Sequence, residues 1–510
     1  MPKSQARGGG ESASLGVKNA DWICDSVMSK TVIIGGGISG LATAYYLQNF
    51  AGADANYLLL ESSSHLGGKI TSDASDGFLV EGGPDSFLTQ KSATLDLCRA
   101  LGLGDQLIGS NQTAMPSTYV LSNGRLHPMP EGMMLMAPTM ILPILRSRLI
   151  SWPGKLRMGM EIFVRPGERD SDESLASFVR RRLGSELLDK IAGPLMAGIH
   201  AGDPERLSLR STFPMFADME QADGSLVLGM IKRKKAQAGS TTTGKRPSMF
   251  TTLTGGLQQL PDAIVGQLNP QQVGLNCRVQ SLAFEGGQYR ISLADGSSIL
   301  ADNVVCTTPA YVTADIVQQL DPSLAEKLRA IRYVSTSTVS LGFRRSELTC
   351  PLNGFGFIVP ASEGRRINAC TWTSTKFSNR APGDCVLIRV FVGGALAEDL
   401  AEQDEAKLIE LARQELREIL GITATPVLAK AYRWHKSNPQ YEVGHRARIA
   451  EIDHVVESHP GLYLAGAAYR GSGIPDCIQS GMDAALKITQ LPATALRSTE
   501  SKVLPVPVAS

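Results

Sequence analysis

The chain has 510 residues, of which 43% are hydrophobic and 19% are charged, so its composition is that of an ordinary globular protein rather than a disordered one. At roughly 150 residues per domain, this length suggests about three domains, or two with insertions. Fifty basic and 49 acidic side chains leave a formal net charge of +1, which argues against a protein built chiefly to bind nucleic acid. The eight cysteines are scattered and form no CxxC pair, which indicates reduced thiols rather than a disulfide framework or a zinc site.

The two ends of the chain are expected to lie outside the folded domains. Residues 1–28 are small, polar and aperiodic, with no apolar segment of the kind that makes a secretory signal. We predict that residues 1–28 form a disordered tail and that residues 493–510 form a second tail. Because the chain has neither a signal segment nor a disulfide framework, we expect a cytoplasmic protein.

The first predicted unit is a strand, a glycine-rich turn and a helix. The β-branched run Thr31–Ile34 predicts a buried parallel strand, and a helix is predicted over Leu41–Phe50. Between them lies Gly35-Gly-Gly-Ile-Ser-Gly40, and a second strand, Tyr57–Leu60, ends on Glu61. A GxGxxG turn between strand and helix, with an acid about twenty residues further on, is typical of dinucleotide-binding Rossmann units.

Each residue of this pattern has a physical role. Gly35 permits the tight turn, Gly37 lets the backbone approach a pyrophosphate, and Gly40 lets the helix pack closely on the strand. The helix N-terminus offers free N–H groups to phosphates, and Glu61 can accept both ribose hydroxyls, which disfavours a cofactor with a 2′-phosphate. The predicted cofactor ligands of this unit are Gly35, Gly36, Gly37, Ile38, Ser39, Gly40, Glu61 and Ser62.

A second anion site is predicted after Glu61. The sequence His65-Leu-Gly67-Gly68-Lys69 places two glycines before a cation, an arrangement that a flavin dinucleotide uses and NAD does not. It resembles the E-x-x-x-R-x-G-G-R/K continuation of amine-oxidase-like flavoproteins, with His65 where that pattern more often has Arg. The resemblance implies an FAD cofactor, with ligands from this stretch and from the next loop: Gly68, Lys69, Gly83, Pro84, Asp85 and Ser86.

The C-terminal part supplies the matching half of this site. Gly461–Gly466 predicts a strand that ends in a glycine turn, and the segment from Tyr469 to Gly481 leads into a helix that runs to about Leu491. In the flavoproteins that the chain resembles, the last helix points its N-terminus at the flavin, where its dipole stabilises negative charge. Ala467 stands where many of these proteins have Asp. The resemblance implies cofactor contacts from Gly466, Ile474, Pro475 and Asp476.

A middle stretch completes the expected FAD domain. A glycine turn leads into a helix that ends near Ile264, a strand begins at Val279, a hairpin with an Asp-Gly turn follows, and Asn303–Ala310 predicts another buried strand. The resemblance places the backbone of Val279 against the adenine. We therefore expect an α/β fold, α+β overall, with a discontinuous Rossmann-type FAD domain over residues 29–88, 251–312 and 427–492.

Two other segments are informative. Gly132–Trp152 is apolar but contains two prolines and two arginines, so it is too broken and too charged for a bilayer span of about 20 residues. It fits a surface that dips into a membrane interface, the wall of an apolar pocket, or a pair of core helices. The basic stretch from Lys232 to Lys245 is predicted to be an exposed loop, and its lack of interleaved aromatic side chains argues against nucleic-acid binding.

From residue 28 to about residue 491 the chain resembles the porphyrinogen oxidases of haem biosynthesis, and their soluble bacterial branch more than their mitochondrial branch. The sequences that carry the resemblance are GPDSF (83–87), AGIHAGD (197–203), ACTWT (369–373), RWH (433–435), PQY (439–441), GH (444–445) and GIPDCI (473–478). The resemblance implies the FAD domain, a mixed-sheet substrate domain over residues 211–250 and 313–426, and a helical region over residues 89–210 beside the substrate cavity. Trp434 is implied to be a flavin neighbour, and Thr118 stands where plant-type enzymes have an arginine for a substrate carboxylate.

The reaction implied by this resemblance removes six electrons from a porphyrinogen, with FAD as hydride acceptor, molecular oxygen as final acceptor and hydrogen peroxide as product. Because the cofactor carries this chemistry, the protein needs an apolar slot and a carboxylate anchor. We predict no catalytic side chain and no metal site. Lys91 follows the Gly83–Phe87 loop by four residues, and we predict that it pairs with a substrate propionate; a surface lysine at a helix start is the alternative.

Several alternatives stay open from the sequence alone. Protoporphyrinogen IX and coproporphyrinogen III both fit the resemblance, and neither the oligomeric state nor a peripheral membrane contact of the helical region is decided. An amine oxidase shares the FAD scaffold but needs an aromatic cage before the last helix, where Ala467-Ala-Tyr469 offers at most one ring. A carotenoid desaturase shares the scaffold too but lacks the ACTWT and GIPDCI sequences. A flavin-binding protein without enzymatic activity is the third alternative.

Overall fold

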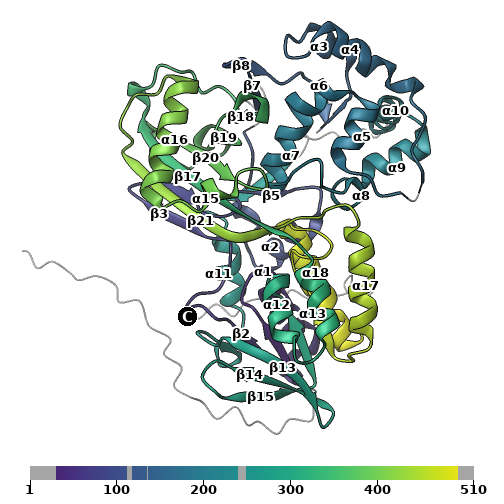
Figure 1. The fold of residues 1–510 in the computed structure, drawn as a ribbon. Coiled ribbons are helices and arrows are strands. Elements are labelled where there is room, and N and C mark those ends of the chain that lie inside the picture. Colours follow the sequence, from purple (N-terminus) through teal and green to yellow (C-terminus); the bar gives the residue numbers. More distant parts are fainter. Residues whose placement is uncertain (1–29, 112–117, 135, 170, 239–247, 492–510) are drawn as a thin grey trace, which may run out of the picture.

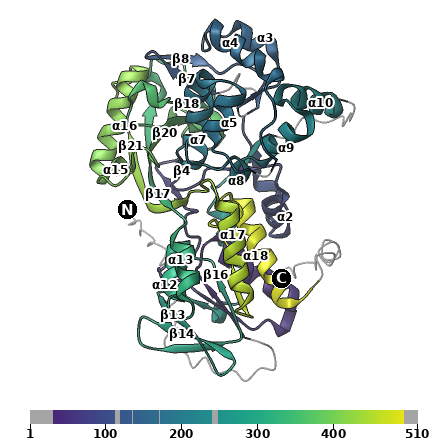
Figure 2. The ribbon, with the colours of Figure 1, turned by 45° about the vertical axis from the view of Figure 1, so that its right-hand side comes forward.

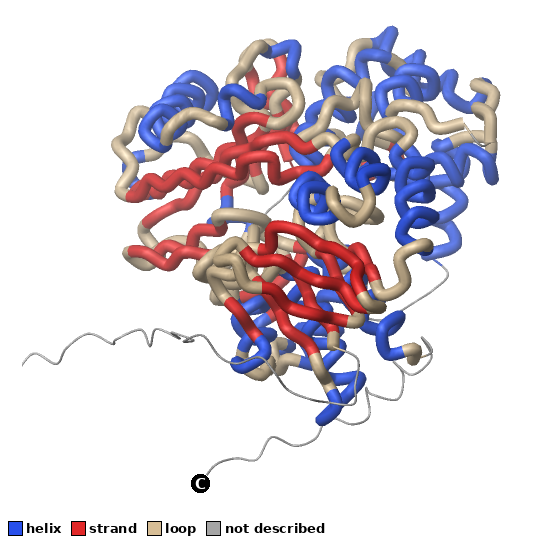
Figure 3. The backbone as a smooth tube through the Cα atoms, turned by 60° about the horizontal axis from the view of Figure 1, so that its bottom comes forward, coloured by secondary structure: helices blue, strands red, loops and turns tan. Residues whose placement is uncertain are grey.

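The computed structural model of the chain describes residues 30–111, 118–134, 136–169, 171–238 and 248–491, and both predicted tails lie outside this part. The described residues form a mixed α/β molecule in two halves (Figure 1). One half is built on a five-stranded parallel sheet, and the other combines a seven-stranded sheet with a group of helices. Figure 3 shows the strands of the large sheets as separate layers with helices around them.

The parallel sheet has the first strand of the chain at its centre. All four residues of β1 are buried, and the strand pairs with β2 on one side and with β16 on the other. Strands that are buried on both faces need cover on both sides of the sheet. The predicted α/β class is confirmed. The strands in spatial order are β12 (Val273–Gly274), β2 (Tyr57–Leu60), β1 (Thr31–Ile34), β16 (Asn303–Cys306) and β22 (Leu462–Leu464).

Two long helices from opposite ends of the chain pack together beside this sheet. α1 (Ile38–Ala51) follows the glycine-rich turn, and α18 (Ile474–Thr489) lies along it. Small residues allow the close approach, since a Cβ at Gly481 would meet the carbonyl oxygen of Ser39. α2 (Ser92–Ala100) and α11 (Gln259–Val265) contribute to the same core.

A small antiparallel sheet and three further helices share a second core with the parallel sheet. The Asp-Gly turn predicted from the sequence joins β14 to β15. The strands are β13 (Val279–Glu285), β14 (Gln288–Leu293) and β15 (Ser298–Ala301). The helices are α12 (Ala310–Val317), α13 (Pro322–Arg329) and α17 (His445–Glu457).

The seven-stranded sheet forms the centre of the other half. It is mixed, because β18 and β7 pair in parallel whereas the other neighbours are antiparallel. α16 (Glu405–Leu420) packs on β17 and β21 through its apolar face. In spatial order the strands are β21 (Leu428–Pro439), β17 (Tyr333–Arg344), β20 (Cys385–Gly393), β19 (Ala369–Trp372), β18 (Gly356–Ile358), β7 (Thr118–Ser122) and β8 (Arg125–Pro128). The short helices α14 (Thr373–Lys376) and α15 (Glu398–Ala401) follow β19 and β20.

The helical region has a core of its own. The helices predicted over Glu173–Leu183 and Leu187–Ala192 are present, the second as a π-helical turn over Leu188–Ala192. Arg182 and Glu161 form a fully buried ion pair at its centre. The helices of this region are α3 (Ile141–Arg146), α4 (Trp152–Gly159), α5 (Leu175–Arg182), α6 (Ser185–Leu187), α7 (Gly193–His200), α8 (Leu209–Thr212), α9 (Pro214–Asp223) and α10 (Leu226–Ala238).

Some segments belong to parts of the molecule other than those predicted. β21 falls in the range predicted for the FAD domain, and β7 and β8 fall in the predicted helical region, yet all three strands join the seven-stranded sheet. α9 and α10 fall in the predicted substrate domain but pack in the core of the helical region. α10 also replaces the first part of the basic loop, of which residues 239–247 lie outside the described chain. β7 and β21 pair with strands that are distant in the sequence, so a local pattern does not reveal their places in the sheet.

The apolar segment Gly132–Trp152 is buried in part and exposed in part. Ile144, Leu149 and Ile150 are buried in the helical core, whereas Leu142 and Trp152 are exposed. Figures 1 and 2 place α3 and α4 at the end of the molecule opposite to β13–β15. Within the part of the chain described by the structure, no helix is both long enough and apolar enough to cross a bilayer.

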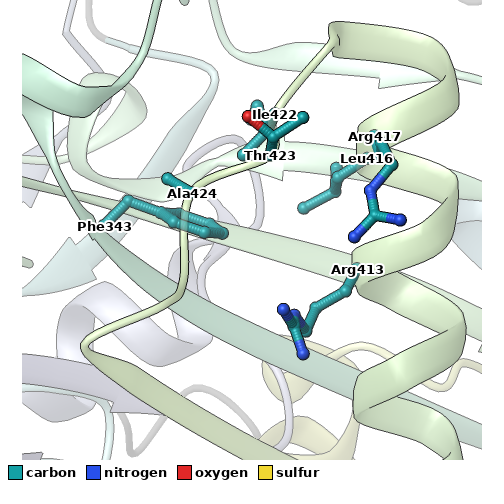
Figure 4. A pocket seen from close by; sticks show the side chains of 7 residues that line it. All are labelled: Phe343, Arg413, Leu416, Arg417, Ile422, Thr423 and Ala424. Atoms are coloured by element: carbon teal, nitrogen blue, oxygen red, sulfur yellow. The ribbon is translucent and has the colours of Figure 1, made fainter.

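Short elements connect these layers. A shallow hollow between α16 and the loop that follows it is lined by Phe343, Arg413, Arg417 and Thr423, and it contains none of the predicted site residues (Figure 4). The small sheets are β3 (Ser72–Ser75) with β4 (Phe78–Glu81), β5 (Phe87–Leu88) with β11 (Phe250–Leu253) and β6 (Leu107–Gly109), and β9 (Met133–Met134) with β10 (Ala137–Pro138). Single 3₁₀ turns occur at Gly52–Asp54, Gly104–Gln106, Met160–Phe163, Pro270–Gln272, Arg345–Glu347 and Ala361–Glu363.

Candidate functional site

Three of the four glycines of the first loop have clearly different environments. Gly35 has a φ of +110°, which L side chains rarely adopt, and a Cβ at Gly40 would overlap the carbonyl oxygen of Gly35. A Cβ at Gly37, by contrast, would meet no protein atom within 4 Å. Gly37 is also the N-cap of α1, and no side chain caps the N–H groups of that helix end. An open backbone face beside free N–H groups fits a pyrophosphate.

The carboxylate of Glu61 is held at the end of β2 by backbone donors. The N–H of Gly36 donates to Oε2 at 2.7 Å, and the N–H of Ser63 donates to Oε1 at 2.8 Å. The Ser62 hydroxyl lies 3.2 Å from Oε1. These contacts fix the orientation of the carboxylate beside the glycine loop and leave acceptor capacity on both oxygens, which fits a ribose with two hydroxyls.

Val279 lies close to the same edge of the sheet. The segment before it runs along Glu61, whose N–H donates to the carbonyl of Gly274 at 2.8 Å and whose carbonyl accepts from Cys277 at 2.8 Å. Val279 itself begins β13 and is 9% exposed. The structure therefore brings together Val279 and Glu61, which the sequence had placed on two separate stretches.

The second glycine pair lies against the first loop. A Cβ at Gly68 would come within 3.1 Å of the Cα of Gly37, so the two glycine loops are in direct contact. The ammonium of Lys69 donates to the carbonyl of Ser437 in β21, and the side chain remains accessible at the surface of the loop. Desolvation by the surrounding protein lowers the pKa of Lys69. Lys69 thus joins the predicted cofactor loop to the seven-stranded sheet.

The Gly83–Ser86 loop is fixed by side chains from that sheet. The indole N–H of Trp434 donates to the carbonyl of Gly82 at 2.9 Å, and Lys376 pairs with Asp85 at 2.9 Å. Burial alone would raise the pKa of Asp85, but the charges of Lys376 and Arg389 outweigh it and hold that pKa well below its usual range. The structure therefore joins Trp434 to the loop that the resemblance assigns to the flavin.

The N-terminus of α18 carries the remaining predicted ligands. Gly466, with a φ of +115°, ends β22, and its N–H donates to the hydroxyl of Ser480 at 2.9 Å. Ile474 and Pro475 are buried in the first turn of α18, where Asp476 also lies. A carboxylate in this turn is stabilised by the helix dipole.

Lys91 reaches this same helix end. It is the N-cap residue of α2, and its ammonium lies 2.6 and 2.8 Å from the two carboxylate oxygens of Asp476. Its side chain is 50% exposed, so the pair with Asp476 is not a buried structural ion pair. Because it has this partner, Lys91 is not an isolated surface lysine either. His200, at the end of α7, is near enough that the Lys91 charge adds to burial in lowering its pKa to about 4. His200 was not predicted as a site residue, and its only signal was its place in the AGIHAGD sequence.

Three further residues of this region carry no motif. Thr338 in β17 and Arg389 in β20 both donate to the loop that contains Gly82, and Lys376 in α14 holds Asp85. Each is an ordinary residue of a strand or a short helix, and only the register of the seven-stranded sheet brings it to the loop.

The geometry therefore fits a flavin dinucleotide, and comparison with known proteins agrees. The model of the family described as flavin containing amine oxidoreductase matches residues 38–489, and the chain belongs to this family. FAD is accordingly its cofactor, as predicted from the sequence.

Individual relatives are similar over almost their whole length. The chain is 38% identical over 454 residues to the coproporphyrinogen III oxidase of Bacillus subtilis (strain 168), a match that covers 88% of this chain and 96% of that protein. It is 28% identical over 509 residues to the mitochondrial protoporphyrinogen oxidase of Nicotiana tabacum, covering 94% and 97%. A solved structure of a candidate protoporphyrinogen oxidase from Exiguobacterium sp. 255-15 superposes with a TM-score of 0.80 and 33% identity, over 91% of this chain and 99% of that one. These similarities confirm the resemblance found in the sequence.

Proposed function

We propose that the protein oxidises a porphyrinogen to the porphyrin and that coproporphyrinogen III is its preferred substrate. The observation that carries the proposal is similarity along the whole chain to three bacterial proteins named for oxidation of that substrate, at higher identity than to the plant proteins named for protoporphyrinogen. Molecular oxygen is the proposed final acceptor. The reaction balances when the six electrons and six protons lost by one substrate molecule convert three O₂ to three H₂O₂.

The proposed division of labour follows from the site. FAD, when bound, supplies the ring that accepts hydride. The Gly35–Gly40 loop and the N-terminus of α1 hold the pyrophosphate, Glu61 holds the ribose, and the Gly83–Ser86 loop with the first turn of α18 orients the ring. Pyrrole N–H protons can pass to solvent, so the proposal assigns no catalytic side chain.

Oxygen dependence tests this proposal directly. Anaerobic addition of coproporphyrinogen III to the holoenzyme should bleach the flavin absorbance. Admission of oxygen should then produce three molecules of hydrogen peroxide for each porphyrin. Porphyrin fluorescence measures the porphyrin, and a peroxide-coupled dye measures the hydrogen peroxide. A strict requirement for NAD or a quinone contradicts the choice of oxygen, and an amine that bleaches the flavin faster than either porphyrinogen favours an amine oxidase instead.

Lys91 is the proposed anchor for a substrate propionate. An ammonium has three N–H donors, and an ion pair as exposed as the one with Asp476 contributes only about 0–1 kcal/mol to stability. The amine therefore keeps donor capacity and can bind a second carboxylate without loss of a strong bond. Its position at the first turn of α18 places this charge beside the residues proposed to orient the flavin ring.

The two candidate substrates distinguish an anchor from a surface lysine. Coproporphyrinogen III carries four propionates and protoporphyrinogen IX two, so we expect Lys91→Ala to reduce kcat/KM for the first by roughly 10- to 100-fold, the value of one charge-assisted hydrogen bond. The effect on the second should be smaller, and Lys91→Arg should restore part of the loss. Lys327→Ala, which removes a half-buried lysine 2.6 Å from its carboxylate partner, is the control. Equal kcat/KM values in the parent and both Lys91 variants would remove Lys91 from the site.

We also propose that the end of the molecule formed by α3 and α4 makes a peripheral membrane contact. Apolar side chains are strongly exposed here: Trp152 is 71% exposed, Leu156 70% and Phe163 78%. The cations Arg146 and Arg148 are exposed beside them. Exposed apolar residues flanked by cations fit the interface of a membrane that contains anionic lipids.

A further inference from the structure

One backbone carbonyl beside the flavin site accepts hydrogen bonds from three side chains. The oxygen of Gly82 lies 2.9 Å from the indole nitrogen of Trp434, 3.1 Å from the hydroxyl of Thr338 and 3.2 Å from Nη2 of Arg389. The same guanidinium nitrogen donates to the carbonyl of Gly83. A carbonyl oxygen has two lone pairs, so this convergence over-determines the position of the loop.

The donors come from three neighbouring strands of the seven-stranded sheet. Trp434 lies on β21, Thr338 on β17 and Arg389 on β20, and these strands are adjacent in the sheet. From the other side, a Cβ at Gly83 would overlap the carbonyl oxygen of Lys69. The loop is therefore held between the second glycine cradle and the sheet, with no room to shift in either direction.

Arg389 lies near enough to Asp85 and Glu81 for its charge to act on both carboxylates, but it has no salt-bridge partner of its own within the described residues. Its side chain is 3% exposed, its Nε atom is buried with no hydrogen-bond partner, and it forms no ion pair with any carboxylate in the described residues. The nearest acids are occupied, since Asp85 pairs with Lys376 at 2.9 Å and Glu81 lies 3.8 Å from Arg380. Its remaining neighbour is the ring of Phe391, 5.0 Å away.

The charged side chains beneath the Gly82–Gly83 loop comprise three cations and two carboxylates. Arg389, Arg380 and Lys376 oppose Asp85 and Glu81, which leaves one positive charge in a buried site. A buried charge that the protein does not neutralise is costly unless it serves a ligand. The cluster lies directly under the loop assigned to the flavin ring, and a flavin gains negative charge when it is reduced.

We propose that Arg389 is a positioning residue that locks the Gly82–Gly83 loop against the flavin and supplies the positive charge that favours flavin reduction. The proposal rests on the assignment of the Gly83–Ser86 loop under the proposed function. The two roles of Arg389 can be tested separately: it holds the loop in position, and it supplies a positive charge near the flavin. Thr338 donates to the same carbonyl without a charge, so it offers a direct comparison.

The test measures the bound flavin without any porphyrinogen. The parent holoenzyme is compared with Arg389→Gln, which removes the charge, Arg389→Lys, which retains it, and Thr338→Val, which removes only a neutral donor. The readouts are the flavin-to-protein ratio, the two-electron midpoint potential measured against reference dyes, and the affinity of sulfite for the bound flavin. Sulfite adds to flavins more strongly when a nearby positive charge stabilises the adduct.

We expect the three variants to differ in flavin potential and in flavin content. Arg389→Gln should lower the equilibrium constant for flavin reduction by about ten-fold, the order expected for one charge in a low-dielectric site, and ten-fold corresponds to about 30 mV for a two-electron couple. Its sulfite affinity should fall in parallel. Arg389→Lys should stay within about three-fold of the parent potential. Thr338→Val should leave the potential unchanged and lower only the retained flavin.

Other results would overturn the proposal. An unchanged potential in Arg389→Gln removes the charge role, and equal potentials in Arg389→Gln and Thr338→Val reduce the effect to loop position. If Arg389→Gln yields no holoenzyme, Lys376→Met, which removes a cation from the same cluster, takes its place: the potential should fall, and an unchanged value overturns the proposal. A parent protein that purifies without flavin would instead contradict the proposed function itself.

Discussion

The half built on the parallel sheet and the half built on the seven-stranded sheet contribute to the candidate flavin site by different means. In the first, backbone geometry decides: Gly35 must take a φ of +110°, Gly40 must lack a Cβ, and Gly37 must leave its face open. In the second, side chains carried on strands hold the loop proposed to orient the flavin, as with Trp434 and Arg389. A site formed by the backbone tolerates few substitutions, so its glycines can be recognised in the sequence. A site formed by side chains on strands can use many residue types, so its sequence has no fixed pattern.

The sharpest test of this comparison uses two glycines of one loop. Gly40→Val should destabilise the fold by about 3 kcal/mol or more, because its side chain would overlap the backbone of Gly35. Gly37→Val meets no protein atom within 4 Å, so we expect the free energy of unfolding of the flavin-free protein to be nearly unchanged while FAD loading is lost. Urea unfolding and the flavin-to-protein ratio check both. A Gly37→Val protein that retains flavin would break the assignment of the pyrophosphate.

The helical region should respond to pH through His200, at the end of α7. Burial lowers the pKa of His200 to about 4, with the charge of Lys91 as the second cause. The unfolded chain binds this proton below about pH 6.5 and the folded protein does not, so the free energy of unfolding should fall as the pH drops from 6.5 to 4, by about 3 kcal/mol in total. Unfolding of the holoenzyme at a series of pH values gives the slope. His200→Gln should flatten it, and an unchanged slope would mean that folding does not shift the pKa of His200.

In the half built on the parallel sheet, Glu61 is predicted to bind the ribose of FAD through its charge. Glu61→Gln replaces a charged acceptor of ribose hydroxyls by a neutral one, and we expect FAD affinity to fall by roughly 10- to 100-fold, or about 1.5–3 kcal/mol. Titration of the flavin-free protein with FAD, followed by quenching of flavin fluorescence, measures this. FAD should remain non-covalent throughout, so acid precipitation of the parent should release the colour to the supernatant.

The smallest effect on stability is expected at the far end of the helical region. Phe163→Ser changes a side chain that is 78% exposed, so the free energy of unfolding should change by less than about 0.5 kcal/mol. Binding to vesicles that contain anionic lipid, measured by co-sedimentation, should nevertheless weaken. Leu300→Ser, at an apolar residue 48% exposed on β15 at the opposite end, is the control. Equal sedimentation of both variants and the parent would remove the membrane contact.

Features that depend on backbone conformation could be predicted from the sequence, whereas features that depend on single side chains could not. The GxGxxG loop and the Asp-Gly hairpin could be predicted because special backbone conformations restrict which residues can stand there. Thr338 and Arg389 could not, because a threonine and an arginine in a strand have many ordinary roles. The sheet that contains β7 and β21 could not be predicted either. Hundreds of residues separate these two strands, and no local pattern shows which strands will pair.

The order of strands in the parallel sheet has a consequence for how the protein is made. β1 pairs with β2 nearby in the chain, but its other neighbour is β16, and the sheet is closed by β22 at Leu462–Leu464. At about 5–20 residues per second, the ribosome delivers Leu462 roughly 20–90 s after Thr31. Until then the all-buried strand β1 lacks part of its cover, and α18 cannot complete the flavin site. A nascent chain must therefore wait through most of its synthesis before it can bind its cofactor.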